Sequence, residues 1–184
     1  VLTTIEVVGS CNQLLIDDLY EADVGYRDDS LGLAILRPRE ALSPAAFAQF
    51  LPGPARLRSD IAVAGFPYGG ARGTASLNYG ILADLRGLNG EESLQRLALD
   101  ITTTEAGGPV LDTTGAVLGM VLPEPAAGRT LPPGVSFALR GDQMQSVLTL
   151  AGLNPTTSSR SDALPQEALA RLGATMTVLV SCWN

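Results

Sequence analysis

The segment with the most specific chemistry in this sequence is a glycine-rich turn at residues 105–110, Glu-Ala-Gly-Gly-Pro-Val. Consecutive glycines let the main chain make a tight turn that aims N–H groups at one point, where they can hold a negatively charged oxygen. Residues 105–110 contain no serine, threonine or cysteine that could attack a carbonyl carbon. The turn therefore predicts a place to hold an oxygen, without an attacking group of its own.

The residue types that are missing exclude most other enzyme chemistry. The 184 residues contain no histidine, and all 12 basic residues are arginine. Without histidine there is no imidazole base and no histidine metal ligand. Without lysine there is no Ser–Lys dyad, no Schiff base and no phosphate-binding lysine. A net charge of −7 with scattered arginines also gives no basic surface for nucleic acid, so we expect no nucleic-acid partner.

Carboxylates are the main acid–base groups that remain. Two of them, Glu6 and Glu105, could run acid–base chemistry if the fold paired them, although separate solvated carboxylates are the more common outcome. The acidic pairs at residues 17–18 and 28–29 could supply oxygen ligands to Ca²⁺, but such pairs beside turns are usually solvated. We expect neither a metal nor a cofactor.

The two cysteines, Cys11 and Cys182, lie near opposite ends of the sequence. This spacing excludes a CxxC redox or zinc pair. One disulfide would tie the carboxyl end to the start of the chain and imply an oxidising compartment. The alternative is two unrelated buried thiols. We favour the disulfide, with Trp183 packed near it.

Short apolar runs separated by Gly and Pro indicate an all-β fold. No run reaches the roughly 18–20 apolar residues of a membrane span. Helices are expected at residues 44–50, 141–151 and 165–172, a surface loop at 154–163, and a strand-like run at 176–180. Ten strands are expected, at residues 1–8, 13–16, 21–26, 33–36, 61–65, 75–85, 95–99, 109–112, 116–122 and 134–139.

Six motifs in order resemble the trypsin-like (chymotrypsin-fold) serine proteases, specifically the HtrA/Deg type. They cover much of residues 1–150 and lie at residues 1–8 (VLTTIEVV), 29–36 (DSLGLAIL), 61–69 (IAVAGFPYG), 78–82 (NYGIL), 105–119 (EAGGPV and the following hairpin) and 134–139 (GVSFAL). The resemblance implies two six-stranded β-barrels, the first lacking its opening strands, with a C-terminal helix and tail. It divides the chain into residues 1–55, 56–150 and 151–184. An unrelated β-barrel with an incidental Gly-Gly-Pro turn is the alternative.

The resemblance also implies that all three catalytic positions are degenerate. Glu6 stands where the family has its histidine, Gly32 where it has the orienting aspartate, and Ala106 where it has the serine. In the former oxyanion loop, formed by Thr104, Glu105, Ala106 and Gly107, the threonine replaces a glycine. The mechanism needs a hydroxyl, a base and a carboxylate that orients the base. The resemblance therefore implies a pseudoprotease.

A protein without this chemistry is expected to bind a protein or peptide, or to be a permanent structural subunit of a larger assembly. Ser136, Phe137 and Ala138 would form the strand that pairs with a peptide, and Asp100 would lie at the base of a specificity pocket. A barrel without its opening strands leaves open edges, which a partner or a preceding segment would fill. The family likeness suggests a bacterial periplasmic or secreted protein. The alternative is a hydrolase that uses non-standard residues, with Glu6 or a cysteine as base or nucleophile.

Overall fold

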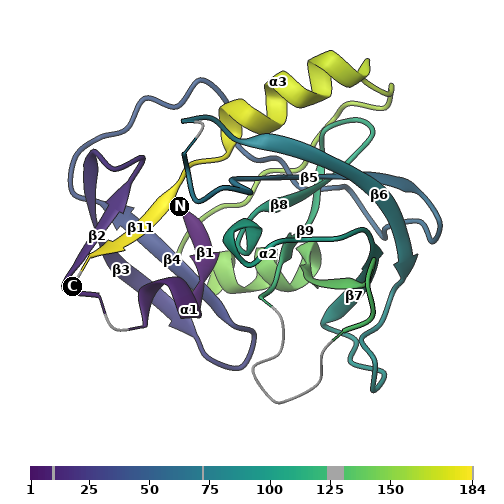
Figure 1. Ribbon diagram of the computed structural model, residues 1–184, viewed down its shortest axis with the longest axis horizontal. Coiled ribbons are helices and arrows are strands. Elements are labelled where there is room, and N and C mark those ends of the chain that lie inside the picture. The colour runs from purple at the N-terminus through teal and green to yellow at the C-terminus, as the bar shows by residue number, and fades with distance from the viewer. Residues whose placement is uncertain (10, 72, 124–130, 184) are drawn as a thin grey trace.

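The computed structural model describes residues 1–9, 11–71, 73–123 and 131–183, and it contains two β units side by side (Figure 1). The second unit is a closed six-stranded barrel, and the first is an open five-stranded sheet. All strand pairs are antiparallel. The structure confirms the predicted all-β, two-barrel architecture with an incomplete first barrel.

The open sheet has the strand order β1-β4-β3-β2-β11, so β1 and β11 are its two edges. Its strands are β1 (Leu2–Thr4), β2 (Gln13–Ile16), β3 (Tyr20–Asp28), β4 (Leu33–Pro38) and β11 (Val180–Trp183). Four strands come from the start of the chain and one from its carboxyl end. The last strand is yellow in Figure 1 and lies beside the purple β2 at the edge of the sheet.

The closed barrel has the strand order β10-β7-β6-β5-β8-β9. Its strands are β5 (Asp60–Gly65), β6 (Ser76–Asp84), β7 (Leu94–Ala98), β8 (Pro109–Asp112), β9 (Val117–Val121) and β10 (Ser136–Arg140). Apolar side chains fill its interior, which is formed by Ile61, Val63, Leu82, Leu97, Leu99, Val110, Leu118, Val121 and Ala138.

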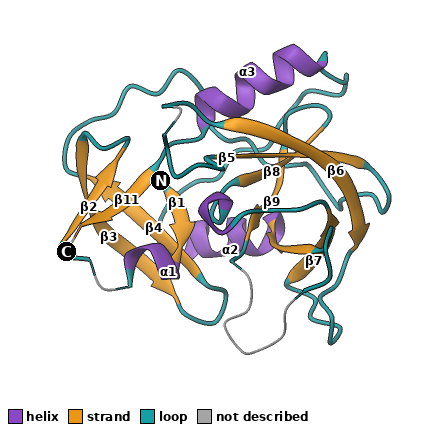
Figure 2. Cartoon of the chain, viewed as in Figure 1, coloured by secondary structure: helices purple, strands orange, loops and turns teal. Residues whose placement is uncertain are grey.

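Within the described part of the chain, three α-helices lie around the strands (Figure 2): α1 (Ile5–Val8), α2 (Gly141–Leu150) and α3 (Gln166–Met176). Met144, Val147 and Leu148 of α2 are buried in a core cluster that also contains Leu33 and Ile35 of the open sheet. Helix α3 crosses the barrel closely at Gly173, where an added Cβ would lie 2.8 Å from Leu77 and 3.3 Å from Ala64. Both faces of β5 are therefore covered, which explains why it is apolar and buried from Ile61 to Gly65.

Three predicted elements differ from the structure. Residues 44–50 are irregular rather than helical, because their main-chain groups bond to other segments: Gln49 accepts from Val117, and the Phe50 N–H donates to Thr156. Residues 5–8 form α1 instead of continuing the strand. The strand predicted at 176–180 begins only at Val180, since α3 extends to Met176.

Two hairpin turns are held by aspartates. Asp17 (φ 52°) and Asp18 (φ 55°) have left-handed backbone conformations in the three-residue connection from β2 to β3, where the Leu19 N–H donates to the Ile16 carbonyl oxygen at 3.1 Å. Between β8 and β9, as predicted, Asp112 Oδ1 accepts hydrogen bonds from the N–H groups of Thr114 and Ala116, and Gly115 has φ 84°. These turns fix the register of both hairpins.

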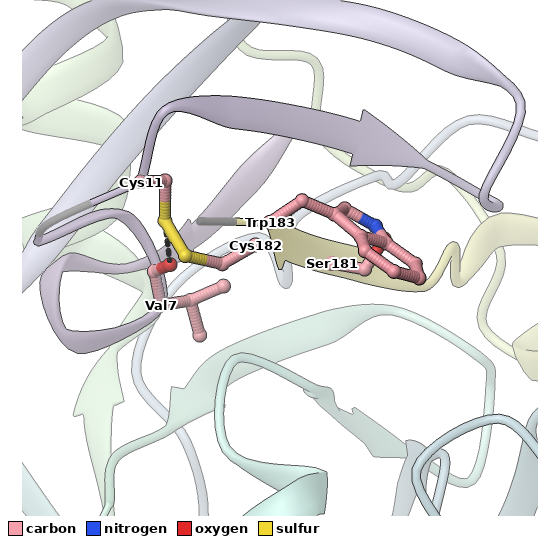
Figure 3. The surroundings of a disulfide bond; sticks show 5 residues. All are labelled: Val7, Cys11, Ser181, Cys182 and Trp183. Carbon is pink, nitrogen blue, oxygen red and sulfur yellow. Dashed lines mark hydrogen bonds between the residues drawn. A yellow bond between two sulfur atoms is a disulfide. The ribbon is translucent and has the colours of Figure 1, made fainter.

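A disulfide joins Cys11 to Cys182 across 171 residues of sequence, as predicted (Figure 3). It connects β11 to the segment between α1 and β2. Within the described residues, no helix is long and apolar enough to span a membrane.

Candidate functional site

The glycine-rich turn begins with a short 3-10 helix, Thr103–Glu105, that is held by the Glu105 carboxylate. Glu105 is only 1% exposed. Its Oε1 accepts a hydrogen bond from Asn78 Nδ2 at 2.6 Å, and its Oε2 accepts from the Thr102 N–H at 2.9 Å and from Thr102 Oγ1 at 2.8 Å. This arrangement is a capping box, in which the side chain of the third residue of a helix accepts a hydrogen bond from the main-chain N–H of the N-cap residue.

Gly65 leaves the space that Glu105 occupies. A Cβ on Gly65 would lie 3.0 Å from Glu105 Cγ and 3.3 Å from Glu105 Cα, closer than side-chain atoms normally approach. Gly108 similarly allows close contact with β5, because its Cβ would lie only 2.2 Å from the Ala64 carbonyl oxygen. The turn is therefore fitted tightly onto the end of β5.

At the end of the 3-10 helix, the Ala106 N–H faces a carbonyl oxygen of the same turn. This N–H donates to the Thr103 carbonyl oxygen at 3.4 Å, and the Gly107 N–H donates to Val121. An N–H that already has an internal acceptor is not available to a developing oxyanion. Thr104 lies inside the 3-10 helix, so it does not adopt the left-handed conformation open to a glycine. In this conformation the loop does not present the pair of N–H groups that its sequence suggested.

The segments that carry the three positions predicted to be catalytic meet at the end of β1. The Ile5 N–H, next to Glu6, donates to the Gly32 carbonyl oxygen at 3.1 Å. On the other side, Gly107, next to Ala106, packs against β1, where an added Cβ would lie 3.2 Å from Thr3 Oγ1 and 3.7 Å from the Thr4 nitrogen. The Glu6 side chain is exposed to solvent.

A crevice of about 90 Å³ runs along this junction. One wall is the turn at residues 103–108, a second is formed by Leu2, Thr3 and Val7, and a third by residues 178–180 of the C-terminal segment. Ala106 lines the crevice. Only the position of Cys182 indicated the third wall from sequence, and no pattern indicated the Asn78–Glu105 contact.

The predicted peptide-pairing strand is not a free edge. Ser136, Phe137 and Ala138 belong to β10, which lies between β7 and β9 in the closed barrel. The Phe137 carbonyl oxygen accepts from the Leu122 N–H at 3.0 Å, and Ala138 pairs with Val121. The prediction of a free edge is therefore wrong for Phe137 and Ala138, because barrel closure uses both sides of their backbone.

A second hollow, of about 20 Å³, lies beside the turn. Its lining residues are Ile101, Thr102, Thr103, Leu122, Pro123, Leu131, Ser136 and Phe137. Asp100 is not among them. Its Oδ1 instead accepts a hydrogen bond from the Gly134 N–H at 2.5 Å, so the carboxylate holds the chain ahead of β10.

The acidic pairs considered for Ca²⁺ have protein partners. Asp17 Oδ1 accepts from the Leu179 N–H at 2.8 Å, and Asp18 Oδ1 accepts from Ser181 Oγ at 2.6 Å. Asp28 Oδ1 accepts from the Ser30 hydroxyl and from two main-chain N–H groups, and these hydrogen bonds lower the pKa of Asp28 below its ordinary value of 3.8. Among the residues that the structure describes, no group of three or more His, Cys, Asp or Glu could hold a metal ion.

Comparison with known proteins places this geometry in a family. Residues 1–120 match the family model described as a trypsin-like peptidase domain. The chain belongs to the trypsin-like peptidase family. Among solved structures, a mutant, inactive form of Rv3671c from M. tuberculosis H37Rv matches with a TM-score of 0.64 and 25% identity, covering 82% of this chain and 76% of that one.

Two further matches extend the comparison. The serine endoprotease from Yersinia pestis has the same fold, with a TM-score of 0.66 and 19% identity over 82% of this chain and 52% of that one. The uncharacterized protein y4bJ of Sinorhizobium fredii (strain NBRC 101917 / NGR234) is 28% identical over 134 residues, which are 69% of this chain and 21% of that protein. This trypsin-like chain therefore spans about a fifth of the length of that relative.

Proposed function

We propose that this protein is a trypsin-like peptidase homologue without serine-protease activity, which binds a protein or peptide or forms a permanent structural subunit of a larger assembly. The observation that carries the proposal is at Ala106. This residue lines the crevice, has no side-chain nucleophile, and has its N–H bonded to Thr103 rather than free for an oxyanion.

The other two catalytic positions support the same conclusion. A carboxylate at Glu6 cannot replace an imidazole that must accept a proton from serine and then donate it to the leaving group. Gly32 has no side chain to orient a base. No other segment of the 184 residues can supply a histidine base, because the sequence contains no histidine.

An apolar groove supports a binding role. It has a volume of about 700 Å³ and shares Leu2, Gly107 and Val178 with the crevice. Its other lining residues include Leu42, Phe47, Met144, Leu153 and Met176, and Phe47 is 73% exposed. Exposed apolar surface of this kind is typical of protein-interaction sites. The disulfide supports placing the protein in the periplasm or outside the cell.

A fluorophosphonate probe tests the absence of activity. This reagent labels activated serine nucleophiles covalently, so we expect no labelling of the purified protein under conditions that fully label trypsin. Ala106→Ser alone is the matched variant, and we expect it to remain unlabelled because no base and no free oxyanion-binding N–H pair accompany the new hydroxyl. Labelling of the unmodified protein would refute the proposal.

Hydrolysis of casein and of small esters tests the remaining alternative. We expect no turnover above the buffer rate. Turnover that disappears in Glu6→Ala would instead identify a hydrolase with a non-standard base. Size-exclusion chromatography of native material then separates the two binding roles, since a permanent subunit elutes only as part of a larger assembly.

A further inference from the structure

The sequence contains one Asn-Gly pair, Asn89–Gly90. The pair lies in the connection from β6 to β7 on the closed barrel (Figure 1), and both residues are exposed to solvent. In such a pair the main-chain nitrogen of the glycine can attack the side-chain amide carbon of the asparagine, because the glycine has no Cβ to obstruct the approach. The connection therefore carries a candidate site of covalent modification.

The turn leaves the attacking nitrogen within reach. Gly90 has φ 86°, a left-handed conformation that suits glycine, and beyond its chain neighbours no atom lies within 4 Å of the position that a Cβ would take. The Gly90 N–H donates to the Gly87 carbonyl oxygen at 3.1 Å. A hydrogen bond inside one exposed turn breaks by local opening at a small cost in free energy. The nitrogen is therefore released repeatedly while the rest of the protein stays folded.

The Glu91 carboxylate holds Asn89 in place. Glu91 Oε2 accepts from the Asn89 N–H at 2.8 Å, and Glu91 Oε1 accepts from Asn89 Nδ2 at 2.7 Å. Gly87 makes room for this carboxylate, since a Cβ on Gly87 would overlap Glu91 Oε2. These hydrogen bonds lower the pKa of Glu91, and the bond from the Asn89 side chain is the largest cause. The leaving nitrogen of the reaction is thus the atom that Glu91 binds.

We propose that Asn89 is a site of spontaneous deamidation, with the Gly90 nitrogen as internal nucleophile and the Glu91 carboxylate as a latch that slows the reaction. The Gly90 nitrogen loses its proton and bonds to Asn89 Cγ, ammonia leaves with Nδ2, and a five-membered succinimide ring forms. Water then adds to one of the two ring carbonyl carbons and breaks its bond to nitrogen. One water is consumed, one ammonia is released, and nothing is oxidised or reduced.

The two products differ in the path of the main chain. Opening the ring at Cγ gives aspartate, whereas opening it at the main-chain carbonyl gives isoaspartate, in which the chain runs through Cγ. Either product places a second carboxylate where Glu91 had a donor, so the latch becomes a pair of like charges that repel each other. The turn then opens, and the reaction is irreversible without a repair enzyme. It needs only residues 87–91 and water, so it does not depend on the proposed function.

Peptide mass spectrometry of the folded protein tests the reaction. Because the chain has no lysine, trypsin cleaves only at arginine, and cleavage after Arg86 and Arg96 releases residues 87–96, in which Asn89 is the one asparagine. During incubation at mildly alkaline pH, a growing fraction of this peptide should show the mass shift of NH replaced by O, and part of it should accept a methyl group from an isoaspartyl methyltransferase. Digestion in heavy-oxygen water marks any conversion that occurs during the digestion itself.

Two exposed asparagines are internal controls in the same digest. Asn12 precedes glutamine, whose side chain obstructs ring closure, and Asn154 precedes proline, whose nitrogen has no hydrogen to lose. Both should stay intact while Asn89 reacts. Equal conversion at Asn12 would show that the glycine and its turn do not select the site, and an unmodified Asn89 in the folded protein would overturn the proposal.

Variants of the neighbouring carboxylates test the latch. Glu91→Ala removes two hydrogen bonds to Asn89 and should speed the conversion by about fivefold or more. Glu92→Ala is the matched control, because Glu92 pairs with Arg86 at 3.6 Å and should leave the rate unchanged. Asn89→Asp mimics one product and should raise the pKa of Glu91 in an NMR titration. A Glu91→Ala variant that reacts no faster, or an unchanged Glu91 pKa in Asn89→Asp, would show that Glu91 is not the latch.

Discussion

Glu105 allows the sharpest test of how the turn at the candidate site is held. Replacing it with alanine removes the acceptor for three donors: Asn78 Nδ2, the Thr102 N–H and the Thr102 hydroxyl. The Thr102 hydroxyl can turn to water because Thr102 is exposed, but the other two donors lose their partner in a part-buried region. A buried donor without a partner costs about 1–3 kcal/mol, and the emptied side-chain space adds to this.

We therefore expect Glu105→Ala to lower the free energy of unfolding by about 4 kcal/mol. For a chain of this size that corresponds to a fall of about 8–16 °C in Tm. Glu105→Gln is the matched control, since it keeps the shape and one acceptor oxygen, and the Asn78 amide can rotate to accept from the new NH₂ group. Its expected cost is about 1 kcal/mol.

Urea denaturation followed by circular dichroism measures both free energies. A double-mutant cycle with Asn78→Ala should give a coupling energy of at least about 1 kcal/mol, because the two side chains are in direct contact. If Glu105→Ala costs less than about 1 kcal/mol, or if the alanine and glutamine variants are equally destabilised, the carboxylate does not hold the turn and the reasoning is refuted.

Two other substitutions test neighbouring features. Gly65→Ala should destabilise the protein by about 2 kcal/mol, because its Cβ would lie 3.0 Å from Glu105 Cγ, while Gly9→Ala should be neutral or slightly stabilising, since its φ is −63° and the nearest atom lies 3.6 Å away. Equal Tm values for the two variants would contradict this. Ser30→Ala should raise the pKa of Asp28, measured by NMR titration of the carboxyl group, because the Ser30 hydrogen bond is the largest cause of its lowering. A lowered carboxyl pKa stabilises the fold at pH values above the carboxyl pKa of the unfolded state, and this stabilisation is lost as the pH falls through the pKa of the folded state. The Ser30→Ala variant should therefore lose less stability on acidification. An unchanged Asp28 pKa in this variant would show that the main-chain N–H groups are enough to keep that pKa low.

Local patterns predicted most of the strands and the α2 helix. The strands β2 and β8 lie at the predicted residues, and the Asp112 to Gly115 turn joins β8 to β9 as expected. These elements depend on alternation and turn residues, which short stretches of sequence express directly. Residues 5–8 did not follow their local preference. The run Ile-Glu-Val-Val favours a strand, yet it forms α1, whose first residue, Ile5, donates its N–H to the Gly32 carbonyl oxygen.

The candidate site was predicted only in part. The family resemblance predicts that Glu6, Gly32 and Ala106 occupy the catalytic positions, and contacts of their neighbours bring those segments together. The hydrogen bond from the Ala106 N–H to Thr103 was not predictable, because the 3-10 helix that makes it is held by Glu105, which meets Asn78 from a strand 27 residues away in sequence. The peptide-pairing prediction failed for a related reason, since whether a strand is an edge depends on which other strands close the barrel.

The sequence by itself determined that these 184 residues contain no histidine and that position 106 is alanine, because folding changes neither. The sequence also favoured a disulfide between its two distant cysteines. Only the tertiary structure decided that Asp17 and Asp18 hold the C-terminal segment, and that this segment forms a wall of the crevice. Contacts across more than 160 residues leave no periodic pattern in the sequence, since each depends on where the intervening barrel places the two ends.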